Sequence, residues 1–533
     1  MTGPTIVHAA YLIDDGQLLD ANALLIENGR IAELGMFDEL RARHASAAVR
    51  DHSGGTITRG LIDGHAHPVW GLMVTVGHSL VACHTPADLR AELQRIAGGL
   101  AAHEPFIGWG LEAVAFGDEV TNDLLHEIFG TDRVSVIHLV DCHSAVVSRR
   151  VLELAGISGP REYIDGSAIV ERREVGNRDG IDRLSGHIVE FSALDAVWPH
   201  LPQSPLEQQA GDLHELLGQM ARSGLTEAWA MDTRGGARVF DLLETAEQQG
   251  ELPIRLRISP WCTPTQDGAG ASELLAIQGR SGRRWRVEGV KFFLDGVIDG
   301  GTAWLSSPDQ QGESTRAFWN DVDAFARRVR EFDAADVPTV THAIGDAAVD
   351  ATARVLAEIV RARGEGDAGP LHRIDHLELV RPETVALIGD AQLSVCLQPT
   401  HCTHFVSESH DDGWSRRVGD RWVDGWPAKR LQDAGATVSL ASDWRVAPFD
   451  PRSIVTDTVL RRSAGSDVEP VYPGEALSVA DALRGYTTNA GARLVPGAAA
   501  DLTVWADNPL AIDPGQIAST PILATYIGGE QTA

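Results

Sequence analysis

The chain has 533 residues, 43% of them hydrophobic and 23% charged, so its composition is globular and it is too long for one average core. Its 45 basic and 75 acidic side chains give a formal net charge of −30. That charge disfavours nucleic acid or an anionic membrane as a partner, because both need cationic side chains to neutralise phosphate.

The cysteines and the amino-terminal residues bear on the compartment. The five cysteines are scattered without a CxxC pair, so a reducing compartment fits better than a disulfide framework. The first residues lack the basic and apolar regions of a secretory signal, and no apolar run reaches the roughly 20 residues that cross a bilayer. We therefore expect a cytoplasmic protein. We also expect a small-molecule substrate, no nucleic-acid or membrane partner, and a homodimer.

Short β-strands are predicted at both ends of the chain. Near the amino terminus, Asn28-Gly29 lies between two apolar stretches, which indicates a hairpin because both residues tolerate positive φ. The carboxy-terminal residues have a similar pattern, with apolar runs at 500–505 and 522–527. Since chain ends often lie close together, we predict one composite β-sandwich domain built from residues 1–58 and 485–533.

The middle of the chain, residues 59–484, alternates short apolar strands with amphipathic stretches such as 321–333 and 346–363. The predicted strands are 60–63, 225–230, 254–260, 287–294, 337–341, 372–375, 393–398 and 437–441. Eight strands in βα order predict an α/β fold of the TIM (β/α)8 barrel type.

A long stretch, residues 68–205, separates the first and second predicted barrel strands and holds a further strand candidate at 134–140. We interpret this stretch as an inserted subdomain after barrel strand 1, and we expect it to cover the mouth of the active site.

The strongest local motif is Gly-Leu-Ile-Asp-Gly-His65-Ala-His67-Pro. In an extended chain, side chains at positions i and i+2 point to the same side, so His65 and His67 can aim two imidazoles at one cation. Two unrelated histidines in a turn are the alternative. The barrel strand directly before the pair favours metal binding.

Four more polar residues fall at or near the ends of separate predicted strands: Lys291, His342, His376 and Asp443. Each of the last three, taken alone, is as well explained as a polar cap on a strand. Lys291 lies amid Val and Phe, where a charged amine is costly to bury, although a lysine can also snorkel to the surface. Together with the His-x-His pair, these residues occupy strands one, four, five, six and eight at the barrel face that carries active sites.

This order of motifs resembles the amidohydrolase superfamily, and within it the YtcJ-like (amidohydrolase 3) branch that includes N-substituted formamide deformylase. The matching stretches are 60–68, 291–303, 341–346, 373–376, 398–401 and 441–451, and the resemblance runs over nearly the whole chain.

The resemblance implies a site with two divalent metal ions, for which Zn²⁺ is expected. The more buried metal would be held by His65, His67 and Asp443, and the more exposed one by His342 and His376. Lys291, carboxylated by CO₂, would bridge the two. A hydroxide between the metals would attack an amide-type carbonyl. Asp443 would accept a proton from the attacking water and deliver it to the departing amine.

Two departures and one further motif concern the pocket. The branch usually has Asp-Gly-His where this chain has Asp-Cys-His143, and Asn-Ser where it has Val147-Ser148, so carried-over substrate contacts are doubtful. His143 and Trp304 are candidate substrate contacts, with a packed or solvated side chain as the alternative for each. His401 and His404 are spaced for one helical face but follow Gln-Pro in a predicted loop, so we do not expect them to be metal ligands.

Three functions remain open at this point. The first is hydrolysis of a C–N bond in an amide, a formamide or a cyclic amide. The second is hydrolysis of a lactone or ester, or deamination of a ring on the same scaffold. Ring deaminases of the superfamily typically use one metal and lack the bridging lysine, so Lys291 speaks against deamination. The third is a non-enzymatic scaffold, which the presence of all six predicted ligands disfavours.

Overall fold

The computed structural model describes residues 3–176, 178–232, 237–266, 268–363, 369–487 and 493–533. The chain divides into two compact units. The first unit comprises Met1–Pro68, Ala210–Thr315 and Val322–Ala533, and the second comprises Val69–Gln209 with Arg316–Asp321. The short segment Arg316–Asp321 joins the second unit from far along the sequence, which the pattern of strands and helices did not predict.

Strands from both chain ends pair in one eight-stranded sheet of the first unit, in the order β25-β24-β23-β5-β1-β3-β4, with β2 beside β1. They are β1 (Thr5–Asp14), β2 (Gln17–Leu18), β3 (Ala23–Glu27), β4 (Arg30–Gly35), β5 (Ala48–Arg59), β23 (Leu502–Trp505), β24 (Ile522–Ile527) and β25 (Glu530–Gln531). The two ends join where β5 and β23 pair antiparallel. The predicted hairpin is confirmed, because Asn28 and Gly29 take φ of 51° and 77° between β3 and β4.

Parallel strands form the rest of the first unit's sheets, and each of the eight predicted strands is confirmed. One sheet runs β17-β15-β14-β6 and the other β16-β18-β19-β20-β21-β22. Their bounds are β6 (Leu61–Ala66), β14 (Leu225–Ala230), β15 (Arg255–Ile258), β16 (Trp261–Cys262), β17 (Trp285–Val287), β18 (Val290–Phe293), β19 (Thr339–Ala343), β20 (Arg373–His376), β21 (Ser394–Leu397) and β22 (Thr437–Leu440). The pairing thus gives two sheets in the described residues, with an isolated parallel bridge from Ala66 to Trp444 between their ends.

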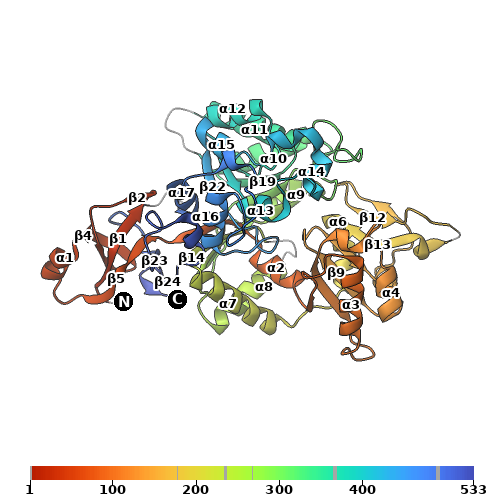
Figure 1. Ribbon diagram of the computed structural model, residues 1–533, viewed down its shortest axis with the longest axis horizontal. Helices are drawn as coiled ribbons and strands as arrows, with labels where there is room; N and C mark the ends of the chain where they lie inside the picture. The colour runs from red at the N-terminus through yellow and green to blue at the C-terminus, as the bar shows by residue number, and fades with distance from the viewer. Residues whose placement is uncertain (1–2, 177, 233–236, 267, 364–368, 488–492) are drawn as a thin grey trace. The chain divides into compact units, whose positions relative to one another are not determined.

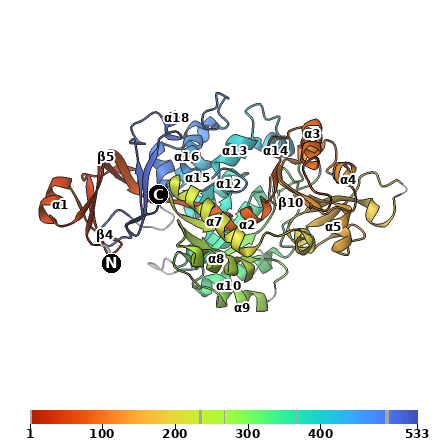
Figure 2. The same ribbon diagram turned by 90° about the horizontal axis from the view of Figure 1, so that it is seen from below.

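Helices connect these strands (Figures 1 and 2). They include α7 (Leu206–Arg222), α8 (Ala237–Gln249), α9 (Gly268–Ala276), α10 (Val322–Ala334), α11 (Asp346–Ala362), α12 (Pro382–Asp390), α15 (Ala428–Ala434), α16 (Pro451–Leu460) and α17 (Val479–Thr487). The longer ones are amphipathic and bury apolar residues, as α10 and α11 do. The predicted helices at 321–333 and 346–363 are confirmed as α10 and α11. Short α-helices α1 (Phe37–Arg43), α13 (Pro399–Phe405), α14 (Gly413–Val418) and α18 (Pro514–Ile517) also belong to this unit.

The second unit has its own seven-stranded sheet, in the order β11-β12-β13-β10-β9-β8-β7. The bounds are β7 (His78–Ser79), β8 (Phe106–Leu111), β9 (Ser135–Leu139), β10 (Ser144–Val147), β11 (Arg161–Glu162), β12 (Ala168–Glu171) and β13 (Leu184–Val189). The strand predicted at 134–140 is β9. Helices α3 (Pro86–Ala97) and α4 (Asp123–Phe129) pack on one face, and α5 (Arg149–Leu154) and α6 (Phe191–Val197) on the other. Across the described residues of both units, no helix has the length and apolar content that spanning a bilayer requires.

Candidate metal centre

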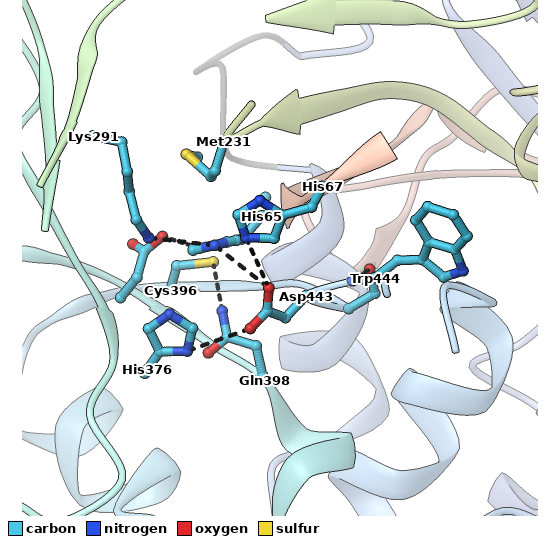
Figure 3. A network of polar contacts seen from close by, with 12 residues as sticks. His65, His67, Met231, Lys291, His376, Cys396, Gln398, Asp443 and Trp444 are labelled. Atoms are coloured by element: carbon cyan, nitrogen blue, oxygen red, sulfur yellow. Dashed lines mark hydrogen bonds and ion pairs between the residues drawn. The ribbon is translucent and has the colours of Figure 1, made fainter. Parts of the chain in front are cut away.

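Three buried side chains from separate strand ends converge in the first unit. His65 is the last residue but one of β6, His376 ends β20, and Asp443 follows β22. Each offers one ligand atom, and these atoms all lie within 4.8 Å of one another. Figure 3 shows the three side chains pointing toward one another. Imidazole nitrogen and carboxylate oxygen are ligands that Zn²⁺ and related cations accept, so this cluster fits a metal ion.

Asp443 contacts several of the predicted ligands at once. Its Oδ1 lies 3.3 Å from His67 Nε2 and 3.6 Å from His65 Nε2, and its Oδ2 lies 3.8 Å from His376 Nδ1. The backbone holds it there, because the Asp443 N–H donates to the His65 carbonyl at 2.8 Å. Asp443 takes a φ of 52° and His376 a φ of 81°, conformations that cost energy and are typical of functional sites.

His65 is fixed by two residues that the sequence did not reveal as part of the site. Its Nδ1 lies 2.5 Å from Asp375 Oδ2, and the Arg373 guanidinium donates to both oxygens of Asp375 at 2.7 and 2.9 Å. Burial opposes ionisation of Asp375, but the charge of Arg373 and the bond to His65 hold its pKa below the ordinary value. The sequence did offer one indication of this arrangement. Arg373 and Asp375 are opposite charges at positions i and i+2 of a predicted buried strand, and unpaired charges are rarely buried.

Lys291 lies beside His65, as the ligand prediction requires. Its side chain is fully buried, and its Nζ is 3.3 Å from His65 Nε2 and 4.8 Å from the centre of the Phe293 ring. Burial lowers the pKa of Lys291 to about 8. Only two of the 45 basic residues of this arginine-rich chain are lysines, Lys291 and the surface residue Lys429. A lysine at this buried position therefore stands out against the chain's own composition.

His342, at the end of β19, packs against His376. The two ring centres are 4.2 Å apart, and His342 Nε2 lies 3.1 Å from the Gly296 carbonyl oxygen and 3.8 Å from Asp295 Oδ1. Asp295 in turn accepts backbone N–H bonds from Ile344 and Gly345, which follow β19. His342 is therefore a neighbour of the cluster rather than one of its three closest members.

Unpartnered buried atoms provide the test of whether these residues fit a metal. Both ring nitrogens of His376, Nδ1 of His67 and Oδ1 of Asp443 have no hydrogen-bond partner. Burial lowers the pKa of His376 well below its ordinary value, with the neighbouring His342 adding to the effect. Burial raises the pKa of Asp443, but the neighbouring imidazoles of His65, His67 and His376 together outweigh it and hold that pKa well below its usual range. A neutral imidazole facing an ionised carboxylate is the state that a divalent cation requires.

The prediction that His401 and His404 lie in a loop is wrong. Pro399 occupies the first turn of α13, where its missing N–H costs nothing, and both histidines lie on this helix. His401 Nε2 lies 3.7 Å from Asp443 Oδ2, whereas His404 Nε2 lies 3.4 Å from Asp457 Oδ2. The sequence analysis thus missed His401 as a residue of the site.

His143 and Trp304 stay predictions as substrate contacts. His143 belongs to the second unit, where its Nδ1 lies 2.8 Å from Glu190 Oε2. Trp304 is half-buried in the first unit, and its backbone N–H donates to Asp295 Oδ2 at 2.9 Å while its carbonyl accepts from the first turn of α11. These contacts locate both residues without testing a role in substrate binding.

Imidazole and carboxylate groups gathered at the carboxyl ends of parallel strands are typical of metal-binding α/β enzymes. The Amidohydrolase family model matches residues 48–533, and the chain belongs to this family. The resemblance predicted from the motifs is confirmed.

Individual relatives are distant but cover almost the whole chain. YtcJ of Bacillus subtilis, named as an amidohydrolase, is 24% identical over 97% of this chain and 97% of its own length. N-substituted formamide deformylase of Arthrobacter pascens is also 24% identical, over 98% of this chain and 97% of its own. A solved structure of an uncharacterized metal-dependent hydrolase from Pyrococcus horikoshii has a TM-score of 0.73 at 20% identity, covering 96% of this chain and 99% of that one. The last likeness extends to the fold alone.

Proposed function

We propose that this protein is a metal-dependent amidohydrolase that cleaves the C–N bond of an amide, a formamide or a cyclic amide. The observation that carries the proposal is the convergence of His65, His376 and Asp443, all buried, with both ring nitrogens of His376 and Oδ1 of Asp443 left without hydrogen-bond partners. Family membership supports the hydrolase class, and the formamide deformylase among the relatives supports the C–N bond.

We propose that two divalent metal ions, Zn²⁺ first among the candidates, bind this centre. The residues that would hold them are His65, His67, Lys291, His342, His376 and Asp443. Lys291 would act in its CO₂-carboxylated form, which turns a buried cation into an anionic ligand and is chemistry that arginine cannot supply. When bound, such metals supply Lewis-acid polarisation of a carbonyl and a water of lowered pKa.

The chain's own residues would orient the site and move the proton. Asp375, held by Arg373, fixes the ring of His65 and leaves its Nε2 facing the centre. Asp443 would accept the proton of the attacking water and deliver it to the nitrogen of the departing amine. Its position against both His67 and His376 suits a group that acts between the attacking and leaving atoms.

Three further proposals concern the whole molecule. We propose that the two parallel sheets close into one eight-stranded barrel, with the strands of both chain ends as a composite domain and 68–205 as the inserted subdomain. We also propose a homodimer, which light scattering on a sizing column tests, and a cytoplasmic location, which fractionation of the native cell tests.

The test of the function combines metal content with a substrate screen. Purified protein is loaded with Zn²⁺ and bicarbonate, its metal is counted by mass spectrometry, and it is offered N-formyl amines, N-acyl amino acids, cyclic imides and lactones. About two metals per chain and turnover of a C–N substrate are expected. Fewer than one metal per chain, or turnover of lactones alone, would contradict the proposal.

The two lysines offer a matched control for carboxylation. After exchange with ¹³C-bicarbonate, the protein should give one carbamate resonance in ¹³C NMR spectra. Lys429→Arg should keep that resonance and Lys291→Ala should lose it, because Lys429 is a surface residue paired with Asp433. A resonance that disappears in Lys429→Arg would contradict the role of Lys291.

A further inference from the structure

Two buried polar side chains next to the metal centre take no part in the proposed mechanism. Asp63 lies two residues before His65 in β6, and Ser442 directly precedes Asp443 after β22. Both side chains are fully buried. Since β6 and β22 are the edge strands of the two parallel sheets, the pair lies where the ligands of one sheet meet a ligand of the other. Buried polar groups are paired inside the protein, so the partners of this pair show what it holds.

The carboxyl group of Asp63 joins the two strand ends. Its Oδ1 accepts the backbone N–H of Ser442 at 3.1 Å and that of His65 at 3.2 Å, and its Oδ2 accepts the hydroxyl of Ser442 at 2.5 Å. Even a protonated carboxyl group keeps one acceptor oxygen, so the two bonds to Oδ1 do not depend on the protonation of Asp63. One side chain of β6 therefore holds the backbone of both strand ends.

The hydroxyl of Ser442 extends this contact past Asp443. Its Oγ accepts the backbone N–H of Trp444 at 2.8 Å while it donates to Asp63. The backbone N–H of Asp443 itself donates to the His65 carbonyl at 2.8 Å. Three consecutive backbone N–H groups, at positions 442, 443 and 444, are therefore held by β6 or by the Ser442 hydroxyl.

The backbone conformation of Asp443 makes this support necessary. Its φ of 52° is unfavourable for a residue with a Cβ, and such a conformation persists only where the surroundings impose it. In Figure 3, the Asp443 carboxylate points toward His65 and His67, while the ring of the next residue, Trp444, points away from them. Release of the flanking N–H groups would let this bend relax and move the carboxylate away from the histidines.

We propose that Asp63 and Ser442 are positioning residues of the metal centre, which hold the backbone of Asp443 so that its carboxylate faces the metal together with His65 and His67. The inference rests on the proposed function, because it assigns the pair a role toward the metals which that function requires. The pair acts through Asp443 and supplies no ligand. Partners that orient a metal ligand typically contribute about 10- to 100-fold to metal affinity.

The test removes one buried hydroxyl and compares the result with the loss of another nearby. Ser442→Ala should weaken Zn²⁺ binding about tenfold in competition with a chelator, since it releases the N–H of Trp444 and one oxygen of Asp63. The matched control is Ser439→Ala, because Ser439 is a buried serine of β22 whose hydroxyl donates to the Val395 carbonyl at 2.9 Å. This variant should keep the Zn²⁺ affinity of the wild type.

A second readout reports the geometry of the centre rather than the stability of the protein. Sites of imidazole and carboxylate ligands also bind Co²⁺, whose visible absorption bands depend on the number and arrangement of its ligands. The spectrum of the Co²⁺-loaded protein should change in Ser442→Ala and stay unchanged in Ser439→Ala. A merely structural role would lower the urea midpoint of unfolding in both variants and leave the affinity and the spectrum of both unchanged.

A variant of the other partner decides the question if Ser442→Ala does not fold. Asp63→Asn keeps the shape of the side chain, and its amide oxygen can still accept both backbone N–H groups. Its NH₂ group cannot accept the hydroxyl of Ser442, so one of the three bonds is lost. The Zn²⁺ affinity should therefore fall several-fold, and the Co²⁺ spectrum should change.

The outcomes are distinct. Wild-type affinity and an unchanged Co²⁺ spectrum in Ser442→Ala, or in Asp63→Asn if the first variant does not fold, overturn this inference and leave the proposed function in place. Equal losses of affinity in Ser442→Ala and Ser439→Ala also overturn it, because the effect would then be common to any buried hydroxyl of this region. A wild-type protein that binds no Zn²⁺ overturns the proposed function and this inference with it.

Discussion

His65 and His376 both lie near the carboxyl ends of parallel strands and both are buried, yet their ring nitrogens have different neighbours. Nδ1 of His65 lies 2.5 Å from Asp375, which Arg373 holds in place. His376 has no hydrogen-bond partner on either nitrogen. One half of the centre is thus organised by the protein itself, and the other half is complete only when a ligand binds.

This difference predicts that the two halves contribute differently to metal binding. A ring fixed by a carboxylate keeps its orientation in the metal-free protein, which reduces the cost of the first binding event. Unpaired nitrogens raise the energy of the metal-free state, so a metal that binds them also relieves a penalty. We therefore expect metal to enter first on the His65 side.

The largest expected effect comes from the residue that contacts both halves. Asp443→Asn removes the carboxylate that faces His65, His67 and His376, so it should lower kcat/KM by at least about 1,000-fold and reduce the metal content. Steady-state kinetics and metal analysis measure both.

The exposed residue Asp433, on α15, provides a control, since Asp433→Asn should leave activity and metal content intact. An Asp443→Asn protein that keeps a tenth of the activity would show that the two halves do not depend on a shared carboxylate.

The second prediction concerns protons. Burial lowers the pKa of His67, but the neighbouring carboxylates of Asp232 and Asp443, 3.6 and 3.3 Å from its ring nitrogens, outweigh it and raise that pKa to about 9. A metal must displace this proton, so Zn²⁺ affinity should rise about tenfold per pH unit between pH 6.5 and 8.5. Since His376 is neutral throughout this range, it contributes no such slope.

Chelator competition in CO₂-free buffer, with one equivalent of Zn²⁺, measures the slope. His67→Ala should flatten it and His376→Ala should keep it. A slope that flattens in His376→Ala and persists in His67→Ala would contradict the prediction, because the metal would then displace a proton from His376.

Much of the site could be predicted because its chemistry is tied to strand ends. The His-x-His pair, Lys291, His376 and Asp443 follow apolar strands of recognisable pattern, and the fold brings such ends together. His401 was not predicted as a site residue because the Gln-Pro before it is typical of a loop. Proline is nevertheless favourable in the first turn of a helix, and His401 lies on α13.

The partners of these residues were harder to predict. Asp375 is adjacent in sequence to His376 but bonds to His65, more than 300 positions away. Neither local propensity nor strand period identifies a pair set by the packing of β20 against the end of β6. The same holds for Asp63 and Ser442, whose hydrogen bonds join residues 379 positions apart.

A smaller effect is expected at the support of His65. Asp375→Asn cannot accept from both Arg373 and His65 as a carboxylate does, so the imidazole loses its fixed orientation. Metal affinity should fall about 10- to 100-fold, as is usual when a carboxylate behind a ligating histidine is lost. Isothermal titration with Zn²⁺ measures the change. An affinity within twofold of wild type would mean that the His65 side is not organised by Asp375.

The smallest effect is on the stability of the metal-free protein, and it tests the comparison most directly. His65→Ala leaves Asp375 with one partner fewer in a buried setting, so it should lower the free energy of unfolding by about 3 kcal/mol. His376→Ala removes a ring of the same size, but its loss also removes two unpaired nitrogens, which offsets the cavity and should leave a change below about 1 kcal/mol. Urea unfolding of chelator-stripped protein measures both variants.

If both lose the same free energy of unfolding, His376 has partners in solution and its side of the centre is organised without metal. A stable His376→Ala variant that binds one Zn²⁺ in place of two would instead separate the two halves, because it would show that the unpaired nitrogens serve the metal and not the fold.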